Sequence, residues 1–442
     1  MASNGTDDYA LDRVPDTGRR AWFGIAVQRF GQISALTQFL VGAMLGFRME
    51  FWNAVLALTL GAIVIELAAI LIGIIGVREG LSTTLLARWT GLGTGGAALL
   101  SLMLGLAITA GFGVQSGIAA QGLASLFGAL PVWAWAVISG LVVTVIVVYG
   151  ISSLAWTAYL AVPLFLVLVT WSITSELLRH PLSEVIGSLP AGPPMSLIAG
   201  ATFVAGSFFV GAVITPDMSR FNRSVADVIK QTVVGITLGE YVVGVAGILL
   251  ALAARTSDVG AIVLSSVGWV GVLVIVLGTV KINDWNLYSG SLAVVNCIET
   301  IVGRRVHRAT VTVVLGAVGT GAAAAGILGW FVELSSAQGY VFAPVGGIMV
   351  AEYFVVKRWR ADLDRTRFAA TLPDSAPRWV PATIVVWVLS ALCGALVPVG
   401  IPPVNAFAFA FVSYVVAGKL GLVTAFGGYH RTERLPAEMS SV

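Results

Sequence analysis

The chain alternates between long apolar runs and short polar connections. Each run stays apolar over about 20 residues, the length that an α-helix needs to cross the hydrocarbon core of a bilayer. A transmembrane β-barrel would instead show strands of ~10 residues with alternating polarity. The pattern therefore predicts an all-α polytopic membrane protein with twelve transmembrane helices. The predicted spans are 22–46, 51–76, 93–126, 131–150, 152–177, 196–217, 225–253, 261–298, 309–332, 337–357, 379–398 and 402–425.

Composition supports the membrane assignment. Hydrophobic residues make up 57% of the chain and charged residues 11%, and the mean hydropathy is +0.93. Soluble domains carry about 25% charged residues. The net charge of +3 belongs to the loops and predicts no nucleic-acid partner. Cys297 and Cys393 lie in apolar runs, so we expect small buried side chains there and neither a disulfide nor a metal site.

Basic residues predict the orientation of the spans. Arg48, Arg179 and Arg255 are the basic residues of the predicted outer loops, whereas the inner segments carry most of the 25 lysines and arginines. An excess of lysine and arginine marks the cytoplasmic side. Residues 1–20 are polar and lack the apolar core of a signal peptide. We therefore expect a multi-pass protein of the cell membrane with both termini in the cytoplasm.

Two features predict an internal duplication. Glutamate follows glycine by five residues in GAIVIE, Gly61–Glu66, and again in GITLGE, Gly235–Glu240. The first and sixth spans also correspond, because 28–38 is a polar interruption and 206–221 contains glycines and a proline. Paired interrupted helices in the two halves of a transporter indicate its binding site. The alternative is two ordinary helices kinked for packing.

The eighth predicted span contains polar residues with apolar stretches on both sides. Lys281, Asn283, Asp284 and Asn286 lie near its middle. A charge at this depth costs roughly 2.5–3.5 kcal/mol on insertion scales, so such residues face a protein interior or a water-filled cavity and usually mark an ion or substrate pathway. The alternative is a structural ion pair between Lys281 and a carboxylate.

Five motifs run through the chain in a characteristic order. They are GLSTTLLARW at Gly80–Trp89, GSFFVGAVITPDMSRFNR at Gly206–Arg223, NDWNLYSGSLAVVN at Asn283–Asn296, PVGGIMVAEYF at Pro344–Phe354 and PVNA at Pro403–Ala406. In this order they resemble the cytosine permeases of the nucleobase:cation symporter-1 family. The resemblance implies a LeuT-type fold, with two inverted five-helix repeats, two further C-terminal helices and alternating access between spans 1, 3, 6 and 8.

The resulting organisation divides the chain into seven segments. They are a cytoplasmic tail (1–21), the first repeat (22–177), an outer loop (178–195), the inverted second repeat (196–357), a cytoplasmic linker (358–378), two accessory transmembrane helices (379–425) and a cytoplasmic tail (426–442).

The resemblance also implies substrate-binding residues. Ser207 and Phe208 match a substrate-contacting serine and a stacking aromatic at the break of the sixth span, and Asn283 matches an asparagine that hydrogen-bonds the base. An aromatic face stacks on a planar heterocycle, and an amide both donates and accepts. We expect Gln38 nearby. The alternatives are a core aromatic for Phe208 and an interhelical hydrogen bond for Asn283.

The third span departs from the family pattern. Cytosine permeases carry a glutamine and, three residues on, a tryptophan, where this chain has Ile108 and Gly111. Phe112 points about 100° away from Gly111 on a helix, whereas Gln115 is one turn along on the same face. The second stacking wall is therefore missing, and a heterocycle bulkier than cytosine would fit the space at Gly111.

A second departure concerns the cation. The family's sodium site uses a hydroxyl pair just before the eighth-span asparagine, and this chain has Lys281 and Ile282 there. We expect the Lys281 ammonium group to replace sodium. Transport would then be coupled to protons, because a buried lysine can lose its proton readily, or to no ion. Asp284, Glu66 and Glu240 are candidate partners.

The sequence thus predicts a secondary active transporter that imports a nucleobase or related small heterocycle independently of sodium. The alternatives are a sodium-coupled cytosine or purine symporter and a membrane sensor that has lost transport. We expect neither an enzyme nor a bound cofactor, because no catalytic constellation and no Walker-type loop is present. The predicted partners are the small heterocyclic substrate and the lipid bilayer. The substrate, the coupling ion and the oligomeric state stay open.

Overall fold

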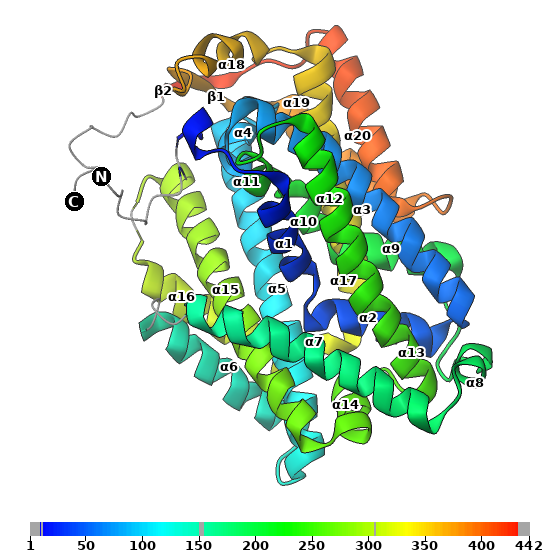
Figure 1. The fold of residues 1–442 in the computed structure, drawn as a ribbon. Coiled ribbons are helices and arrows are strands. Elements are labelled where there is room, and N and C mark those ends of the chain that lie inside the picture. Colours follow the sequence, from blue (N-terminus) through cyan, green and yellow to red (C-terminus); the bar gives the residue numbers. More distant parts are fainter. Residues whose placement is uncertain (1–8, 10–11, 150–153, 305, 432–442) are drawn as a thin grey trace.

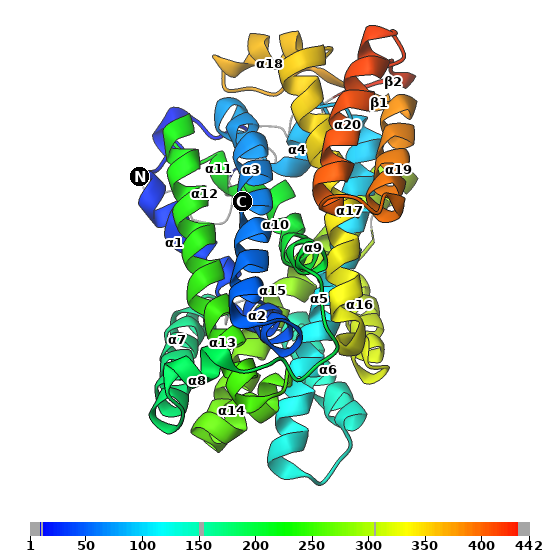
Figure 2. The same cartoon turned by 90° about the vertical axis from the view of Figure 1, so that its right-hand side faces the viewer.

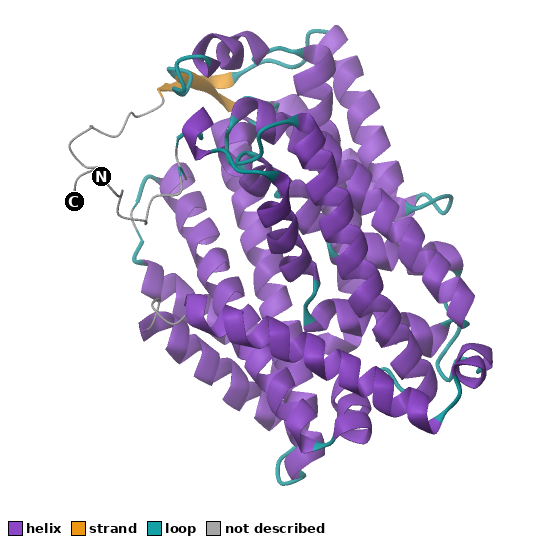
Figure 3. Cartoon of the chain, viewed as in Figure 1, coloured by secondary structure: helices purple, strands orange, loops and turns teal. Residues whose placement is uncertain are grey.

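The computed structural model is a bundle of helices (Figure 1), and helices dominate the part of the chain that the structure describes (Figure 3). The structure describes residue 9 and residues 12–149, 154–304 and 306–431. The predicted boundary between the fourth and fifth spans, about half of the first tail and the end of the last tail lie outside these residues. Five described helices are at least 18 residues long and apolar enough to cross a membrane, and the bent pair α1–α2 makes a sixth.

The first half of the chain is a series of apolar helices. Its helices are α1 (Trp22–Ile33), α2 (Leu36–Arg48), α3 (Phe51–Glu79), the short α4 (Thr83–Ala87), α5 (Gly93–Phe127), α6 (Val132–Tyr149) and α7 (Leu154–Arg179), after a 3-10 turn η1 (Asp16–Gly18). The short helix α8 (Leu182–Gly187) follows. The helical segments agree with the first five predicted ranges.

The second half repeats this pattern with more interruptions. Its elements are α9 (Leu197–Ser207), α10 (Phe209–Val213), α11 (Thr215–Ser219), α12 (Val225–Gly239), the π-helical turn η2 (Glu240–Gly244), α13 (Val245–Ala254), α14 (Val259–Val267), α15 (Trp269–Val302), α16 (Arg308–Ala324), the 3-10 turn η3 (Ile327–Trp330), α17 (Phe331–Ala351) and the π-helical turn η4 (Glu352–Val356).

Two predicted spans differ from the structure. Gly268, at φ +73°, divides the predicted span 261–298 into α14 and α15. The predicted span 309–332 ends at Ala324, because Gly326, at φ +83°, begins a tight turn into η3. Both glycines have a positive φ, which glycine adopts at little cost and other residues avoid. Uninterrupted apolar sequence concealed these turns.

Glycines bring the first and seventh spans into backbone contact. A Cβ at Gly42 of α2 would lie 2.0 Å from the carbonyl oxygen of Gly244, and a Cβ at Gly247 of α13 would lie 2.3 Å from that of Phe39. In the same way, Gly239 of α12 leaves room for Ile33 of α1. Small residues that let backbones approach are a common basis of helix association in membranes. The bent first span therefore follows α12–α13 closely, as Figure 2 shows.

One end of the molecule is tied by polar contacts and a small sheet. The helix α18 (Arg360–Arg367) and the strand β1 (Ser375–Trp379) precede the last two helices, α19 (Pro381–Leu396) and α20 (Pro402–Lys419), and β1 pairs antiparallel with β2 (Phe426–Arg431) (Figure 1). The strands were not predicted. The residues 358–378 and 426–442 were expected to be a plain linker and a tail.

A buried carboxylate gathers the segments at this end. Glu79, at the end of α3, accepts hydrogen bonds from Arg13 Nη1 at 2.9 Å and from the Tyr353 hydroxyl at 2.5 Å, and it also binds Arg367 of α18. The side chains of Arg13 and Glu79 are 2% and 0% exposed. This cluster holds the segment before α1 and the helix α18 against the end of α3 and the turn η4.

Candidate functional site

The first span is broken between α1 and α2. The two helices meet at 56°, and Ser34 between them leaves helical geometry with ψ 58°. The Ser34 hydroxyl and the Gln32 carbonyl oxygen Oε1 are buried without a partner among the described residues. A break of this kind exposes polar groups inside an apolar bundle, where they can bind a ligand because protein shields them from lipid.

The sixth span is broken at Phe208 and again at Ile214. Phe208 lies between α9 and α10 with φ −127° and ψ 13°. Its half-buried ring covers Gly211, where a Cβ would lie 2.5 Å from ring carbons. Ser207 donates its hydroxyl hydrogen to the carbonyl oxygen of Val204 at 2.7 Å, so only its lone pairs remain for another partner. The predicted Phe208 and Ser207 therefore lie at the break, as expected.

Arg29 joins the two broken helices. This fully buried side chain of α1 donates from Nη1 to the carbonyl oxygen of Gly211 at 3.0 Å and from Nη2 to Thr215 Oγ1 at 2.6 Å. Its guanidinium carbon is 6.0 Å from the centre of the Phe208 ring. The sequence prediction did not name Arg29, although a charge inside an apolar span is itself a functional signal.

A second set of polar contacts joins α2, α3 and the π-helical turn. Gln38 of α2 donates its Nε2 hydrogen to Glu240 Oε2, and Thr237 donates to Glu66 Oε1 at 2.6 Å. Tyr241 shares a hydrogen bond with Thr59 of α3. The predicted residues Gln38, Glu66 and Glu240 thus belong to one region. The sequence related Glu66 to Glu240 through the repeat but related neither of them to Gln38.

The third and eighth spans meet the first span just after its break. Gln115 of α5 donates to Thr37 Oγ1 of α2 at 3.5 Å. A Cβ at Gly278 of α15 would lie 3.7 Å from Leu36 Cδ1. The start of α2 therefore contacts both α5 and α15, and Gln115 lies at this junction.

Asn283 links α15 to α5. Its Nδ2 donates to the carbonyl oxygen of Phe112 at 3.1 Å and to Ser116 Oγ at 3.0 Å, and its Oδ1 accepts from Asn286 Nδ2 at 3.2 Å. Both amide hydrogens are thus in use, which agrees with the alternative of an interhelical hydrogen bond. A direct contact of Asn283 with substrate stays a prediction.

Gly111 faces Asn286. A Cβ added at Gly111 would meet a single atom within 4 Å, the Asn286 Nδ2 at 3.9 Å. Both residues are partly exposed within the bundle. The space left by glycine is therefore open, and Asn286 is the amide beside it. The sequence places Asn286 among the polar residues of the span but does not predict it as a substrate ligand.

Lys281 is half-buried and makes no hydrogen bond or ion pair with the residues that the structure describes. Asp284 follows one helical turn later on α15, with its Oδ1 buried and unpartnered in the described chain. The predicted alternative, an ion pair within 4 Å between Lys281 and a carboxylate, is absent from these residues. Lys281 also lies one turn after Gly278, which faces the start of α2.

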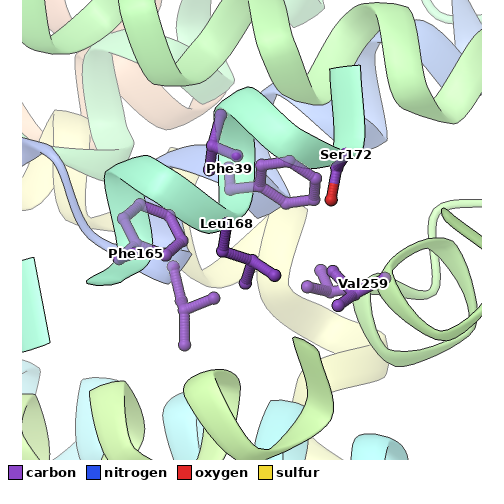
Figure 4. A pocket seen from close by; sticks show the side chains of 8 residues that line it. Phe39, Phe165, Leu168, Ser172 and Val259 are labelled. Carbon is purple, nitrogen blue, oxygen red and sulfur yellow. The ribbon is translucent and has the colours of Figure 1, made fainter. Parts of the chain in front are cut away.

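A small pocket lies beside this junction but is separate from it. Phe39 of α2, Phe165, Leu168 and Ser172 of α7 and Val259 of α14 point into it (Figure 4). Apart from Ser172 its walls are apolar, and it includes none of the predicted substrate-binding residues. It offers a heterocycle too few hydrogen-bond partners to serve as the binding site. Within the described residues, no three histidine, cysteine, aspartate or glutamate side chains could hold a metal ion.

A bundle of apolar helices with two broken spans in contact is the architecture of a secondary membrane transporter. The family model for permeases of cytosine/purines, uracil, thiamine and allantoin matches residues 14–418. The chain belongs to this permease family, the nucleobase:cation symporter-1 family. It is a multi-pass membrane transporter and no enzyme.

Known relatives agree with this assignment. The chain is 27% identical to cytosine permease of Escherichia coli K12 over 422 residues, which cover 94% of this chain and 95% of that protein. It superposes on inward-facing Mhp1 with a TM-score of 0.79 at 18% identity, covering 93% of both chains. It superposes on closed Mhp1 with bromovinylhydantoin bound with a TM-score of 0.69 at 20% identity, covering 93% and 95%.

A more distant match extends the fold comparison. A Na⁺-coupled sialic acid symporter superposes with a TM-score of 0.62 at 11% identity, covering 96% of this chain and 93% of that one. The predicted all-helical LeuT-type fold is therefore confirmed. The sites, the repeat boundaries and the orientation of the termini stay predictions.

Proposed function

We propose that this protein imports a nucleobase or related small heterocycle by alternating access, independently of sodium. Membership of the permease family across residues 14–418 carries the substrate class. The basic inner segments support an orientation with both termini in the cytoplasm.

In the proposed site, Phe208 supplies the stacking face and Asn286 the amide. Asn286 Nδ2 borders the open space at Gly111, whereas Asn283 uses both of its amide hydrogens to hold α5. Ser207 accepts a hydrogen bond, and Gln115 and Gln38 flank the site from α5 and α2. Because glycine replaces the second aromatic wall, the site suits a heterocycle larger than cytosine.

Lys281 takes the place of the sodium ion in this proposal. It has no ion-pair partner among the described residues, and it lies one turn from the contact between Gly278 and Leu36, where the eighth span meets the break in the first. A tethered ammonium group keeps the positive charge that a sodium ion would bring and would repel the ion itself. Asp284, one turn further along, is the nearest acidic neighbour on the helix.

Counterflow in proteoliposomes tests the transport function. Vesicles are preloaded with unlabelled cytosine, uracil, adenine, hypoxanthine or allantoin, and uptake of the same radiolabelled compound is followed with and without sodium. We expect exchange of at least one of these, most strongly a bicyclic base, at equal rates in both salts. Phe208→Ala serves as a site variant and should reduce exchange.

The other readings give different results. Exchange that requires sodium would identify a sodium-coupled symporter and remove Lys281 from the cation role. Binding of a heterocycle by thermal shift without any exchange would identify a sensor. Failure of every compound in both assays would contradict the proposed function.

A further inference from the structure

Glu240 is a fully buried carboxyl group in the middle of the seventh span. It begins the π-helical turn η2, which interrupts the helix between α12 and α13. Such single-turn π-segments within helices are frequent at functional sites. One carboxyl oxygen, Oε2, accepts from Gln38, and the other, Oε1, is buried without a partner in the described chain.

No cation balances this carboxyl group among the described residues. The helices packed around it contribute Gln38 from α2, Glu66 from α3 and Arg29 from α1. Arg29 lies against Gly235 and uses its Nη1 and Nη2 on Gly211 and Thr215 of the sixth span. Glu66 is a second acid, bound to Thr237. Tyr241, the next residue along the turn, is bonded to Thr59.

This environment favours the neutral form of the carboxyl group. A buried carboxylate without a cation costs far more than a neutral carboxyl, so the group takes up a proton instead. Glu66 adds to this cost whenever it is charged. Binding and release of a proton at Glu240 form and break only the O–H bond, and no other reactant is required.

Gln38 connects this group to the break in the first span. It lies on α2, four residues after Ser34. Its side chain bonds Glu240 through the amide nitrogen Nε2 and not through the amide oxygen. A charged carboxylate holds an N–H donor about twice as strongly as a neutral one does. Protonation of Glu240 therefore loosens Gln38 and frees its amide for a substrate at the break.

We propose that Glu240 is the proton-binding site of this transporter and that Gln38 links its protonation to substrate binding. This inference rests on the proposed function in assuming a heterocyclic substrate. It does not depend on Lys281 taking the place of sodium. It assigns the coupled ion to the contact between the first and seventh spans, while Lys281 stays a fixed charge between the first and eighth. A substrate and a proton then favour each other's binding by on the order of tenfold.

Proteoliposomes with an inward pH gradient test the coupling, with the compound that shows counterflow. The wild type should accumulate it above equilibrium. Glu240→Gln, which is permanently neutral, should keep counterflow but lose accumulation and the pH dependence of its apparent affinity. Glu333→Gln, at an exposed position in the first turn of α17, is the matched control and should accumulate like the wild type.

Three results would overturn the proton site. The first is that Glu240→Gln accumulates the compound as well as the wild type does. The second is that Glu66→Gln loses accumulation while Glu240→Gln keeps it. The third is that the wild type shows counterflow but does not respond to the pH gradient. Absence of counterflow in the wild type would instead contradict the proposed function.

An infrared measurement needs no substrate and judges the site separately. At neutral pH the purified wild type should show the C=O stretching band of a protonated carboxyl group. This band should lose intensity in Glu240→Gln and keep it in Glu333→Gln. A spectrum that is unchanged in Glu240→Gln would also refute the assignment.

Discussion

Arg29 Nη1 donates a 3.0 Å hydrogen bond to the carbonyl oxygen of Gly211, so the first broken span binds the second within its interrupted region. That carbonyl lies between the two breaks of the sixth span, and Thr215, at the next break, takes the other arm of the same guanidinium group. One buried side chain therefore connects the two broken spans of the candidate site.

Arg29→Gln should destabilise the protein and impair exchange. Hydrogen bonds from a charged group are worth ~1.5–3 kcal/mol each, and the variant leaves buried acceptors unsatisfied. Arg29→Lys should not restore the wild type, because an ammonium group lacks the planar fork that reaches both acceptors. Thermal unfolding in detergent, together with counterflow, measures this. Arg304→Gln, at an exposed position, is the control, and equal melting of the two variants would contradict the role of Arg29.

Gly111→Trp should shift selectivity toward smaller heterocycles. The side chain would enter open space beside Asn286 and supply a second aromatic wall, as in cytosine permeases. Exchange of bicyclic bases should fall relative to cytosine. A ratio of exchange rates measured for both compounds on both proteins checks this, and an unchanged ratio would show that Gly111 does not face the substrate.

Phe208→Ala should weaken substrate binding by more than the loss of buried contact area alone would cause. Aromatic stacking contributes about 1 kcal/mol beyond area, or about fivefold in affinity. Phe208→Tyr keeps the ring and should bind nearly as well as the wild type. Apparent affinities from counterflow distinguish the two, and equal affinity in all three proteins would place the substrate elsewhere.

Glu79→Gln should lower stability by about 3–5 kcal/mol, because it leaves Arg13 and Arg367 without their buried partner. Asp362→Asn is the matched control. Asp362 pairs with the exposed Arg365, and surface ion pairs contribute about 0–1 kcal/mol. Unfolding in denaturant compares the two, and similar losses would argue against a buried cluster.

Gly42→Ala should disrupt the bundle, since its Cβ would fall 2.0 Å from the carbonyl oxygen of Gly244. Gly24→Ala, on α1, meets nothing within 4 Å and should be neutral or stabilising by up to ~1 kcal/mol, because alanine favours helix over glycine. Expression level and melting temperature of both variants test this pair. A well-folded Gly42→Ala protein would show that α2 and α13 can separate.

The long helices and the two broken spans followed from sequence because apolar length and polar interruption are local properties. The turns at Gly268 and Gly326 could not be predicted in this way, since hydropathy does not report backbone dihedral angles. Arg29 was missed for a different reason. Its partners are the carbonyl oxygen of Gly211 and the hydroxyl of Thr215, some 180 residues later in a span whose breaks could not be read from Arg29's own segment.

The sequence predicted the residues of the candidate site better than the contacts between them. Family resemblance identified Asn283 and its span, whereas the structure commits its amide to α5 and leaves Asn286 beside Gly111. Glu240 and Gln38 were both named, for different roles. Their hydrogen bond depends on tertiary packing of the first span against the seventh, so the local sequence could not predict it.

The pairing of β1 with β2 closes the chain around α19 and α20. The strand before α19 meets the strand after α20, with Ser375 opposite Arg431 and Trp379 opposite Phe426. The turn between the helices, 397–401, is exposed along most of its length at the other end of the pair. A protease that cut this turn would thus produce two fragments that stay joined, because the sheet holds the severed ends as a covalent cross-link would.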